Sequence, residues 1–352
     1  MTVTVTVDEP GTTLEPIEVL HVGRRGEVAG GMTQVVNGYL SYPFDDCELR
    51  VIVSRDGSTG PRALALFLGA AWRIGTLRGR ESRVVVVHLS QGGSFVREGL
   101  LLRLAHARGF GTVAHLHGSS FPDYAAREPA RVARVLRAAD SVFVLSDETR
   151  AAVLGVVPSA STELIPNAVP EGMPRTKEKR IVFGGSVSLR KGVDVLVDAW
   201  RAIADHDGWT LDIVGPVADP EVVPESLPDA VFHGSLPHAQ LMELLETAEI
   251  AVLPSRDEAM PMFILEALAR RDCVIATRVG GIPSVLGGGA GVLVDAGDAA
   301  GLAAAVQELM TSDAARDEVR AAGTARFQRD YSAAAVYPML AARWRAVLPG
   351  SR

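Results

Sequence analysis

The sequence predicts an α/β protein made of two domains, and three observations support this fold class. The chain has 352 residues, which is more than a single hydrophobic core usually serves. Short apolar runs rich in Val, Ile and Leu alternate with longer amphipathic stretches, which is the pattern of parallel strands joined by crossover helices. The segment 166–180 carries three prolines in a polar run, so it predicts a linker between the domains.

The first domain is expected at residues 1–168, as a Rossmann-like unit with six strands. These strands are predicted at 17–23, 48–54, 83–90, 112–117, 141–146 and 162–166. The 16 residues before them lack the basic start and the apolar run of a signal peptide.

The second domain is expected at residues 169–330, where the same alternation begins again. Its strands are predicted at 180–185, 210–215, 230–235, 250–255, 273–279 and 291–295. The stretch 314–348 predicts helix with an interruption near Tyr331 and Ser332. We expect residues 331–352 to form a C-terminal helix that packs back on the first domain.

Charge and cysteine content narrow the class of protein. Residues 1–168 hold 17 basic and 17 acidic residues, and residues 169–352 hold 18 and 25, so the net charge of −7 lies in the second half. This balance disfavours a general nucleic-acid surface. Cys47 and Cys273 are the only cysteines, which form neither a disulfide framework nor a zinc spacing and indicate the cytoplasm. No apolar run reaches the roughly 18 residues that a membrane span needs.

The segment 254–286 carries the strongest functional signal. It places Glu258 in a loop just before a helix opened by Pro261, with Glu266 in the early turns of that helix. A helix start presents free N–H groups and a positive dipole end, so the loop 257–263 is suited to hold a diphosphate, and Glu266 to accept ribose hydroxyls. Two glutamates alone are more often a solvated pair around a core helix, and the wider context decides between these interpretations.

The run EAMPMFILE (258–266) resembles the paired-glutamate motif of retaining family 4 glycosyltransferases, also called glycosyl transferases group 1. Further blocks match this family in the same order, and they are GGMTQVV (30–36), HLHG (115–118), IPN (165–167), FGGSVSLRKGVDVL (183–196), HGSLPHAQL (233–241) and VGGIPSVL (279–286). The resemblance implies the GT-B fold, in which two Rossmann-like domains with parallel sheets face an interdomain cleft. It assigns acceptor binding to the first domain and nucleotide-sugar donor binding to the second.

The resemblance also implies a donor site in the second domain. Lys191 matches the lysine that holds the donor diphosphate as the glycosidic bond breaks. The family usually has arginine directly after the glycine of this block, whereas this chain has Ser186. Either Arg190 supplies the second charge, or the activity is weaker than usual. The residues that the resemblance assigns to donor binding are Gly30, Gly31, Arg190, Lys191, Ala259, Met260, Pro261, Met262, Phe263 and Glu266.

In the first domain, Gly30 and Gly31 open a helix after the first strand and permit close approach of the backbone to a ligand. His117 matches the family histidine beside the transferred sugar, and with Lys191 and Glu258 it completes the expected catalytic set. His115, two residues earlier on the same strand, is expected to be structural. A lone glycine pair or histidine would more often belong to a tight turn or a satisfied core.

The resemblance implies front-face transfer with retention of configuration, in which the leaving phosphate deprotonates the acceptor hydroxyl. No protein nucleophile, metal or other cofactor is then expected. The expected co-substrate is a nucleotide sugar, with a UDP-sugar or a GDP-sugar favoured. The triplet Asp205-His206-Asp207 precedes Gly208 in a helix-to-strand turn, so we interpret it as a polar turn rather than a manganese site.

The acceptor is expected to be a polysaccharide, a lipid-linked sugar or a small metabolite. The apolar stretch 63–72 is flanked by arginines and fits either a peripheral membrane surface or a buried crossover helix with solvated arginines, of which the second is favoured. These arginines are Arg62, Arg73, Arg78, Arg80 and Arg83.

Two other functions stay open beside glycosyl transfer. One is a sugar-nucleotide binding protein that has lost turnover, which Ser186 motivates, and the other is a sugar-nucleotide epimerase of the GT-B fold. A dinucleotide oxidoreductase is disfavoured because no G-x-G-x-x-G follows the opening strand of either domain.

Overall fold

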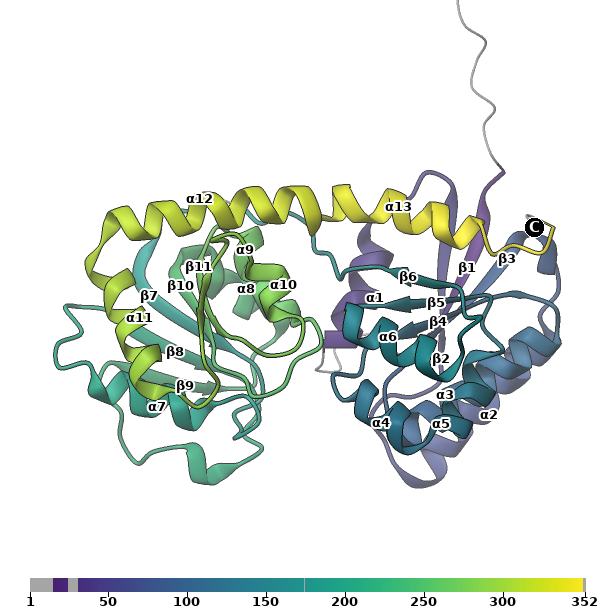
Figure 1. Ribbon diagram of the computed structural model, residues 1–352, viewed down its shortest axis with the longest axis horizontal. Coiled ribbons are helices and arrows are strands. Elements are labelled where there is room, and N and C mark those ends of the chain that lie inside the picture. Colours follow the sequence, from purple (N-terminus) through teal and green to yellow (C-terminus); the bar gives the residue numbers. More distant parts are fainter. Residues whose placement is uncertain (1–14, 25–30, 174, 351–352) are drawn as a thin grey trace, which may run out of the picture.

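The computed structural model describes residues 15–24, 31–173 and 175–350. They form two α/β domains that lie side by side, each built on a six-stranded parallel sheet with helices on both faces (Figure 1). The predicted fold class is confirmed. Each of the twelve predicted strands is present with its ends within two residues of the predicted ones.

The first sheet has the strand order β2-β1-β3-β4-β5-β6. Its strands are β1 (Ile17–Gly23), β2 (Cys47–Val53), β3 (Arg83–Leu89), β4 (Gly111–Leu116), β5 (Ser141–Val144) and β6 (Thr162–Leu164). Its helices are α1 (Gly31–Ser41), α2 (Gly60–Thr76), α3 (Gly92–Ala107), α4 (Phe121–Arg127), α5 (Pro129–Leu136) and α6 (Asp147–Val156), with a short 3-10 turn at Arg80–Ser82. β3 and β4 are buried along almost their whole length, as strands covered on both faces must be.

The second sheet has the order β12-β11-β10-β7-β8-β9. Its strands are β7 (Glu178–Gly184), β8 (Thr210–Val214), β9 (Ala230–Gly234), β10 (Ala248–Leu253), β11 (Cys273–Thr277) and β12 (Val292–Val294). Its helices are α7 (Val193–Ala202), α8 (His238–Thr247), α9 (Met262–Ala269), α10 (Ile282–Leu286) and α11 (Ala299–Thr311), with a 3-10 turn at Pro220–Val222. Pro261 is the N-cap of α9, so the helix begins one residue later than the sequence predicts. Asp205–Asp207 lies in the turn between α7 and β8, as expected, with Asp207 at a φ of 46°.

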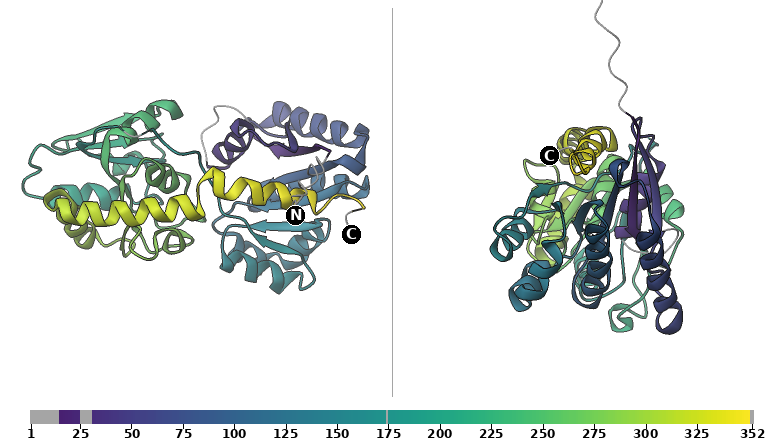
Figure 2. Two further views of the ribbon diagram at one scale, coloured as in Figure 1. Left: turned by 90° about the horizontal axis from the view of Figure 1, so that it is seen from above. Right: turned by 90° about the vertical axis from the view of Figure 1, so that its right-hand side faces the viewer.

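Two C-terminal helices run along both domains. α12 (Asp313–Asp330) follows the second domain and α13 (Ala333–Arg345) follows the first (Figures 1 and 2). The break falls at Tyr331 and Ser332, where the sequence predicts it, because a parallel bridge to Val169 of the linker interrupts the helix. Trp344 of α13 is fully buried, with its ring centroid 5.3 Å from that of His21 on β1. The last helix is therefore part of the core of the first domain.

α2 is less buried than the favoured interpretation of the stretch 63–72 predicts. Only Ala70 and Ile74 among its residues are buried, and large apolar side chains on its outer face are exposed. Among the described helices, none combines the length and the apolar character needed to cross a bilayer.

Candidate functional site

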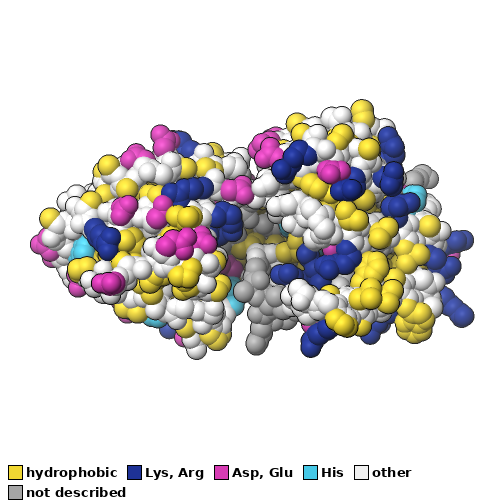
Figure 3. Space-filling model, turned by 90° about the horizontal axis from the view of Figure 1, so that it is seen from below, with side chains coloured by type: hydrophobic (Ala, Val, Ile, Leu, Met, Phe, Trp, Pro, Cys, Tyr) yellow, Lys and Arg dark blue, Asp and Glu magenta, His cyan; other side chains and the backbone are white. Residues whose placement is uncertain are grey.

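The carboxyl ends of the strands of both sheets approach one another between the domains, which is where ligands bind in open parallel α/β sheets. A cavity of about 200 Å³ lies there. The first domain lines it with Ser119, Ser120, Pro122, Asp123, Ser146, Glu148 and Thr149. The second domain lines it with Arg256, Asp257, Glu258, Ala259, Val279, Gly280 and Gly281. Figure 3 shows the hollow between the two domains. Another cavity, of about 430 Å³, lies beside Ser141 at the start of β5 and is remote from this cleft.

Lys191 and Glu258 form an ion pair at the second-domain wall of the cleft. Their side chains are only 14% and 10% exposed, and Ser255 donates its hydroxyl to the same Glu258 oxygen over 2.8 Å. Gly192, at a φ of +71°, lets the loop after β7 approach the loop after β10, since a Cβ there would lie 1.9 Å from the carbonyl oxygen of Pro254. The backbone thus brings a cation and a carboxylate together although they are 67 residues apart.

The loop that carries Glu258 rests on a pair of glycines from the block 279–286. A Cβ on Gly280 would lie 1.6 Å from the carbonyl oxygen of Glu258, and one on Gly281 would lie 2.0 Å from that of Ala259. Gly280 also has a φ of +50°, which favours glycine. This close packing fixes the position of the loop 257–263 relative to the block 279–286.

The domain linker holds the next turn of the same loop. Asn167, buried in the linker, donates its side-chain N–H to the carbonyl oxygen of Met260 over 3.0 Å. Met262 at the start of α9 reaches the first domain, where a Cβ on Gly31 would lie 3.6 Å from its Cγ. Gly31 therefore faces the start of α9 across the cleft, and Gly30 lies outside the described residues.

Phe263 and Glu266 on α9 are both largely buried. The ring of Phe263 packs over Gly184 at the end of β7, where a Cβ would lie 2.5 Å away. Glu266 forms a hydrogen bond of 2.8 Å with Nε2 of His238 on α8. His238 belongs to the block 233–241 but was not singled out from the sequence, because its partner is 28 residues away.

The basic residues near Lys191 have different surroundings. Arg190 is exposed and donates to the carbonyl oxygen of Asp257 over 3.1 Å, which places its guanidinium over the loop 257–263. Arg256, which the sequence analysis missed, lines the cavity and forms a bidentate pair with Asp194 at 2.8 and 2.6 Å. Across the cleft, Ser119 donates to the Asp257 carboxylate over 2.6 Å, so this residue joins the two domains.

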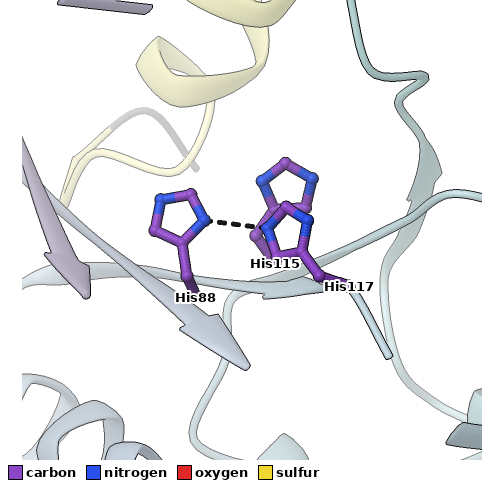
Figure 4. A group of neighbouring side chains, drawn as sticks. All are labelled: His88, His115 and His117. Carbon is purple, nitrogen blue, oxygen red and sulfur yellow. Dashed lines mark hydrogen bonds between the residues drawn. The ribbon is translucent and has the colours of Figure 1, made fainter. Parts of the chain in front are cut away.

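His117, at the end of β4, belongs to a chain of imidazoles that runs into the first domain. Its Nε2 lies 2.8 Å from Nδ1 of His88, and Nε2 of His88 lies 3.0 Å from Nδ1 of His21 (Figure 4 shows the first of these contacts). Burial lowers the pKa of His88 and His117 well below the usual value, and neighbouring histidines add to this effect. Burial likewise lowers the pKa of His21 to about 3. The three rings are therefore neutral at pH 7, and only the central ring, His88, is bonded to described residues through both of its nitrogens.

His115 lies beside this chain, with its ring centroid 4.1 Å from that of His117. Burial lowers its pKa to about 3, and no described residue is within hydrogen-bond reach of its Nε2. Among the described residues, His88, His115 and His117 are the group whose ligand atoms lie close enough, within 4.8 Å, to hold a metal ion. Both ring nitrogens of His88 are already engaged by other imidazoles, so the contacts present support a hydrogen-bonded chain.

The structure brings together most of the residues predicted for the site. Lys191, Glu258, Arg190 and the loop 259–263 lie at one edge of the second sheet. His117 comes from the facing edge of the first sheet, but the described wall of the cavity begins two residues later, at Ser119. The motif HLHG indicated His115 and His117, whereas His88 on the neighbouring strand carried no signal because a pairing between strands is not visible in the sequence.

Comparison with known proteins gives matches of two kinds. Residues 178–312 match the family model described as "Glycosyl transferases group 1". The glycogen synthase of Mycobacterium tuberculosis is 32% identical over 166 residues, which are 45% of this chain and 40% of that protein. The chain thus spans about two fifths of the length of this curated relative.

Two solved structures share the fold over nearly the whole chain. Sucrose-phosphate synthase from Thermosynechococcus elongatus superposes with a TM-score of 0.73 at 19% identity, covering 94% of this chain and 99% of that one. HepE of Anabaena, solved in complex with UDP-glucose, has a TM-score of 0.70 at 14% identity, covering 93% and 99%. The fold is that of these two-domain GT-B proteins.

Proposed function

We propose that this protein is a retaining glycosyltransferase that moves a sugar from a nucleoside diphosphate sugar to an acceptor hydroxyl, without a metal ion. The observation that carries the proposal is the ion pair of Lys191 with Glu258, held against the start of α9 at the mouth of the interdomain cleft. The matches of residues 178–312 to glycosyltransferases support it, because this segment contains both residues.

Lys191 is suited to hold the donor diphosphate. When the bond between the anomeric carbon and the diphosphate oxygen breaks, negative charge grows on the leaving group, and a nearby ammonium stabilises it. In the absence of donor, Glu258 balances the lysine charge. We propose that donor binding places the diphosphate beside Lys191 and leaves the Glu258 carboxylate facing the sugar hydroxyls.

The second charge on the diphosphate comes from Arg190 in this proposal, because Ser186 stands where the family usually has arginine. The exposed guanidinium of Arg190 already lies over the donor loop, 3.1 Å from the carbonyl oxygen of Asp257. The Glu266 carboxylate would accept hydrogen bonds from the ribose hydroxyls of the nucleotide sugar. These bonds would replace the hydrogen bond with His238 or form beside it.

Retention follows from attack on the same face as the leaving group. The acceptor oxygen bonds to the anomeric carbon while the bond to the phosphate breaks, and the acceptor proton passes to a phosphate oxygen. His117 is neutral, so its role in this scheme is to orient the sugar by a hydrogen bond. Charge on the leaving group is balanced by protein cations and backbone N–H groups, which is why we propose that no metal is needed.

The donor is proposed to be a UDP-sugar or a GDP-sugar, and the complex of HepE with UDP-glucose favours the first. We place the reaction in the cytoplasm, with a polysaccharide, a lipid-linked sugar or a small metabolite as acceptor. A binding protein without turnover would share the donor site, and an epimerase would change the sugar without releasing the nucleotide.

The test combines binding and turnover. Thermal unfolding is measured with UDP, GDP, ADP, TDP and CDP, each with and without EDTA, since a ligand that binds the native state raises its stability. Release of UDP from UDP-glucose is then compared in the wild type, in Lys191→Ala and in Lys179→Ala, a control whose exposed lysine pairs with Asp207 away from the cleft.

We expect one nucleotide to raise the melting temperature in the presence of EDTA, and the release of UDP from UDP-glucose to be lost in Lys191→Ala alone. Binding that disappears with EDTA would contradict metal independence. Binding without any nucleotide release would favour the binding protein, and conversion of the sugar with the nucleotide retained would favour the epimerase.

A further inference from the structure

The outer face of α2 carries a stripe of large exposed apolar side chains. Leu64, Leu68 and Trp72 are 58%, 55% and 69% exposed. They follow one another at intervals of four residues, so they lie on one face of the helix. α3 packs against α2 and adds the exposed side chains of Val96 and Leu100. A contiguous apolar surface of this kind on a folded domain usually marks a site of interaction.

The surroundings of this stripe are strongly basic. The segments 57–80 and 92–109 contain one acidic residue, Glu98, and it is fully buried. The same segments contain seven arginines, which are Arg62, Arg73, Arg78, Arg80, Arg97, Arg103 and Arg108. Arg73, Arg78 and Arg103 are exposed and form no ion pair with any carboxylate in the described part of the chain. The surface thus combines apolar side chains with unpaired positive charge.

The position of the surface is also informative. Figure 3 shows hydrophobic side chains gathered on the half of the molecule formed by the first domain, with Lys and Arg side chains around them. The hollow between the domains opens on the same face. A flat partner that covers α2 and α3 would therefore lie beside the mouth of the cleft.

We infer that α2 and α3 form a docking surface for an anionic phospholipid bilayer, called here the α2–α3 face. Aromatic and leucine side chains enter the boundary between headgroups and acyl chains, while arginines at the rim bind lipid phosphates. Arg62, Arg80 and Arg97 pair with Asp56, Glu81 and Glu98, which leaves Arg73, Arg78, Arg103 and Arg108 as the arginines of these segments that form no ion pair in the described part of the chain. The anionic surface of a membrane matches both the charge and the apolar stripe.

Tryptophan fluorescence offers a direct probe of this inference. The chain has four tryptophans, and Trp200, Trp209 and Trp344 are at most 2% exposed, so Trp72 alone among them can change its environment on binding. Vesicles of phosphatidylcholine with phosphatidylglycerol should shift the emission of Trp72 to shorter wavelength, and brominated acyl chains should quench it. Vesicles of phosphatidylcholine alone should do neither.

Co-sedimentation with the same vesicles gives the affinity. The triple variant Leu64→Ser, Leu68→Ser, Trp72→Ser should lose binding, and Arg73→Gln and Arg78→Gln should each weaken it by about fivefold at low salt. All five side chains are exposed, so these variants should keep the melting temperature of the wild type. The matched control is Met173→Ser, Val217→Ser, Val231→Ser, which removes three exposed apolar side chains outside the α2–α3 face and should bind vesicles normally.

Three outcomes would overturn the inference. The first is the absence of binding to either kind of vesicle. The second is equal binding to neutral and anionic vesicles, because the arginines would then have no role. The third is a self-association, seen by sedimentation velocity, that the triple variant abolishes while the wild type leaves vesicles unbound; the α2–α3 face would then be a contact between two copies of the chain.

Discussion

Nζ of Lys191, at the carboxyl edge of β7, forms an ion pair with Oε1 of Glu258, which follows the neighbouring strand β10. Both groups are nearly buried, and Ser255 holds the same carboxylate oxygen. A cation and an anion withdrawn from water in this way depend on one another, because removal of either leaves an uncompensated charge. Stability and activity can therefore be separated by changing both residues.

Lys191→Ala should lower glycosyl transfer by about 100-fold or more, since a cation beside the leaving diphosphate is lost. The same change should destabilise the fold by about 3 kcal/mol, because the buried Glu258 carboxylate loses its partner. The double variant Lys191→Ala, Glu258→Gln should recover most of the stability and none of the activity. Urea unfolding and nucleotide release measure the two effects. If the double variant also recovered activity, neither Lys191 nor Glu258 would take part in transfer.

Gly280→Ala should weaken donor binding strongly. Its methyl group would meet the carbonyl oxygen of Glu258, and the donor loop must move. The control is Gly288→Ala, which has a similar positive φ of +71° but no atom within 4 Å of the added Cβ. Both variants bear the same kind of backbone strain, of about 1 kcal/mol. Calorimetric titration with UDP or GDP should show weaker binding in Gly280→Ala alone, and equal affinities would contradict this account of the loop.

Asn167→Ala should weaken donor binding by about tenfold or more, since the carbonyl oxygen of Met260 loses its anchor and the loop 259–263 becomes less ordered. The cost in stability should be about 1–3 kcal/mol, as for other buried groups left without a partner. Tyr337→Phe is the control, because it removes a hydrogen bond of 3.0 Å to the neighbouring carbonyl of Ala168 without touching the loop. A similar loss of donor affinity in both variants would show that the linker, and not this contact, matters.

The free energy of unfolding should fall as the pH drops below about 6.5. The folded pKa values of His21, His88, His115 and His117 all lie below the usual value of 6.5. Above that pH both states are neutral and the full stability is present. Between 6.5 and the folded values of about 3 for His21 and His115, the unfolded chain binds protons that the folded chain does not. Each such proton contributes a slope of about 1.4 kcal/mol per pH unit.

Chemical denaturation at a series of pH values measures this slope. His115→Phe removes one of the four imidazoles and should reduce the slope by about 1.4 kcal/mol per pH unit near pH 5. A slope that His115→Phe leaves unchanged would contradict a buried, neutral His115.

The fold could be predicted in considerable detail because its signal is local. The apolar runs of β3 and β4 and the proline-rich linker each express a short-range property of the chain, namely burial on two faces or the loss of backbone N–H donors. The interruption at Tyr331 and Ser332 was also predicted, although the structure places a long-range bridge between Val169 and Ser332 there. α2 is the expected crossover helix, but its outer face is exposed and not buried, and the sequence could not show this because an apolar stretch has the same composition in both cases.

The sequence by itself determined the order of the elements, the two parallel sheets, and the positions of Lys191, Glu258 and His117 at the ends of strands. Only the tertiary structure decided which groups meet. Asn167 reaches Met260, and His88 connects His117 to His21, through contacts between segments that are 93, 29 and 67 residues apart. The physical reason is that periodicity reports which face of an element is buried, whereas a hydrogen bond between distant segments depends on how whole elements pack.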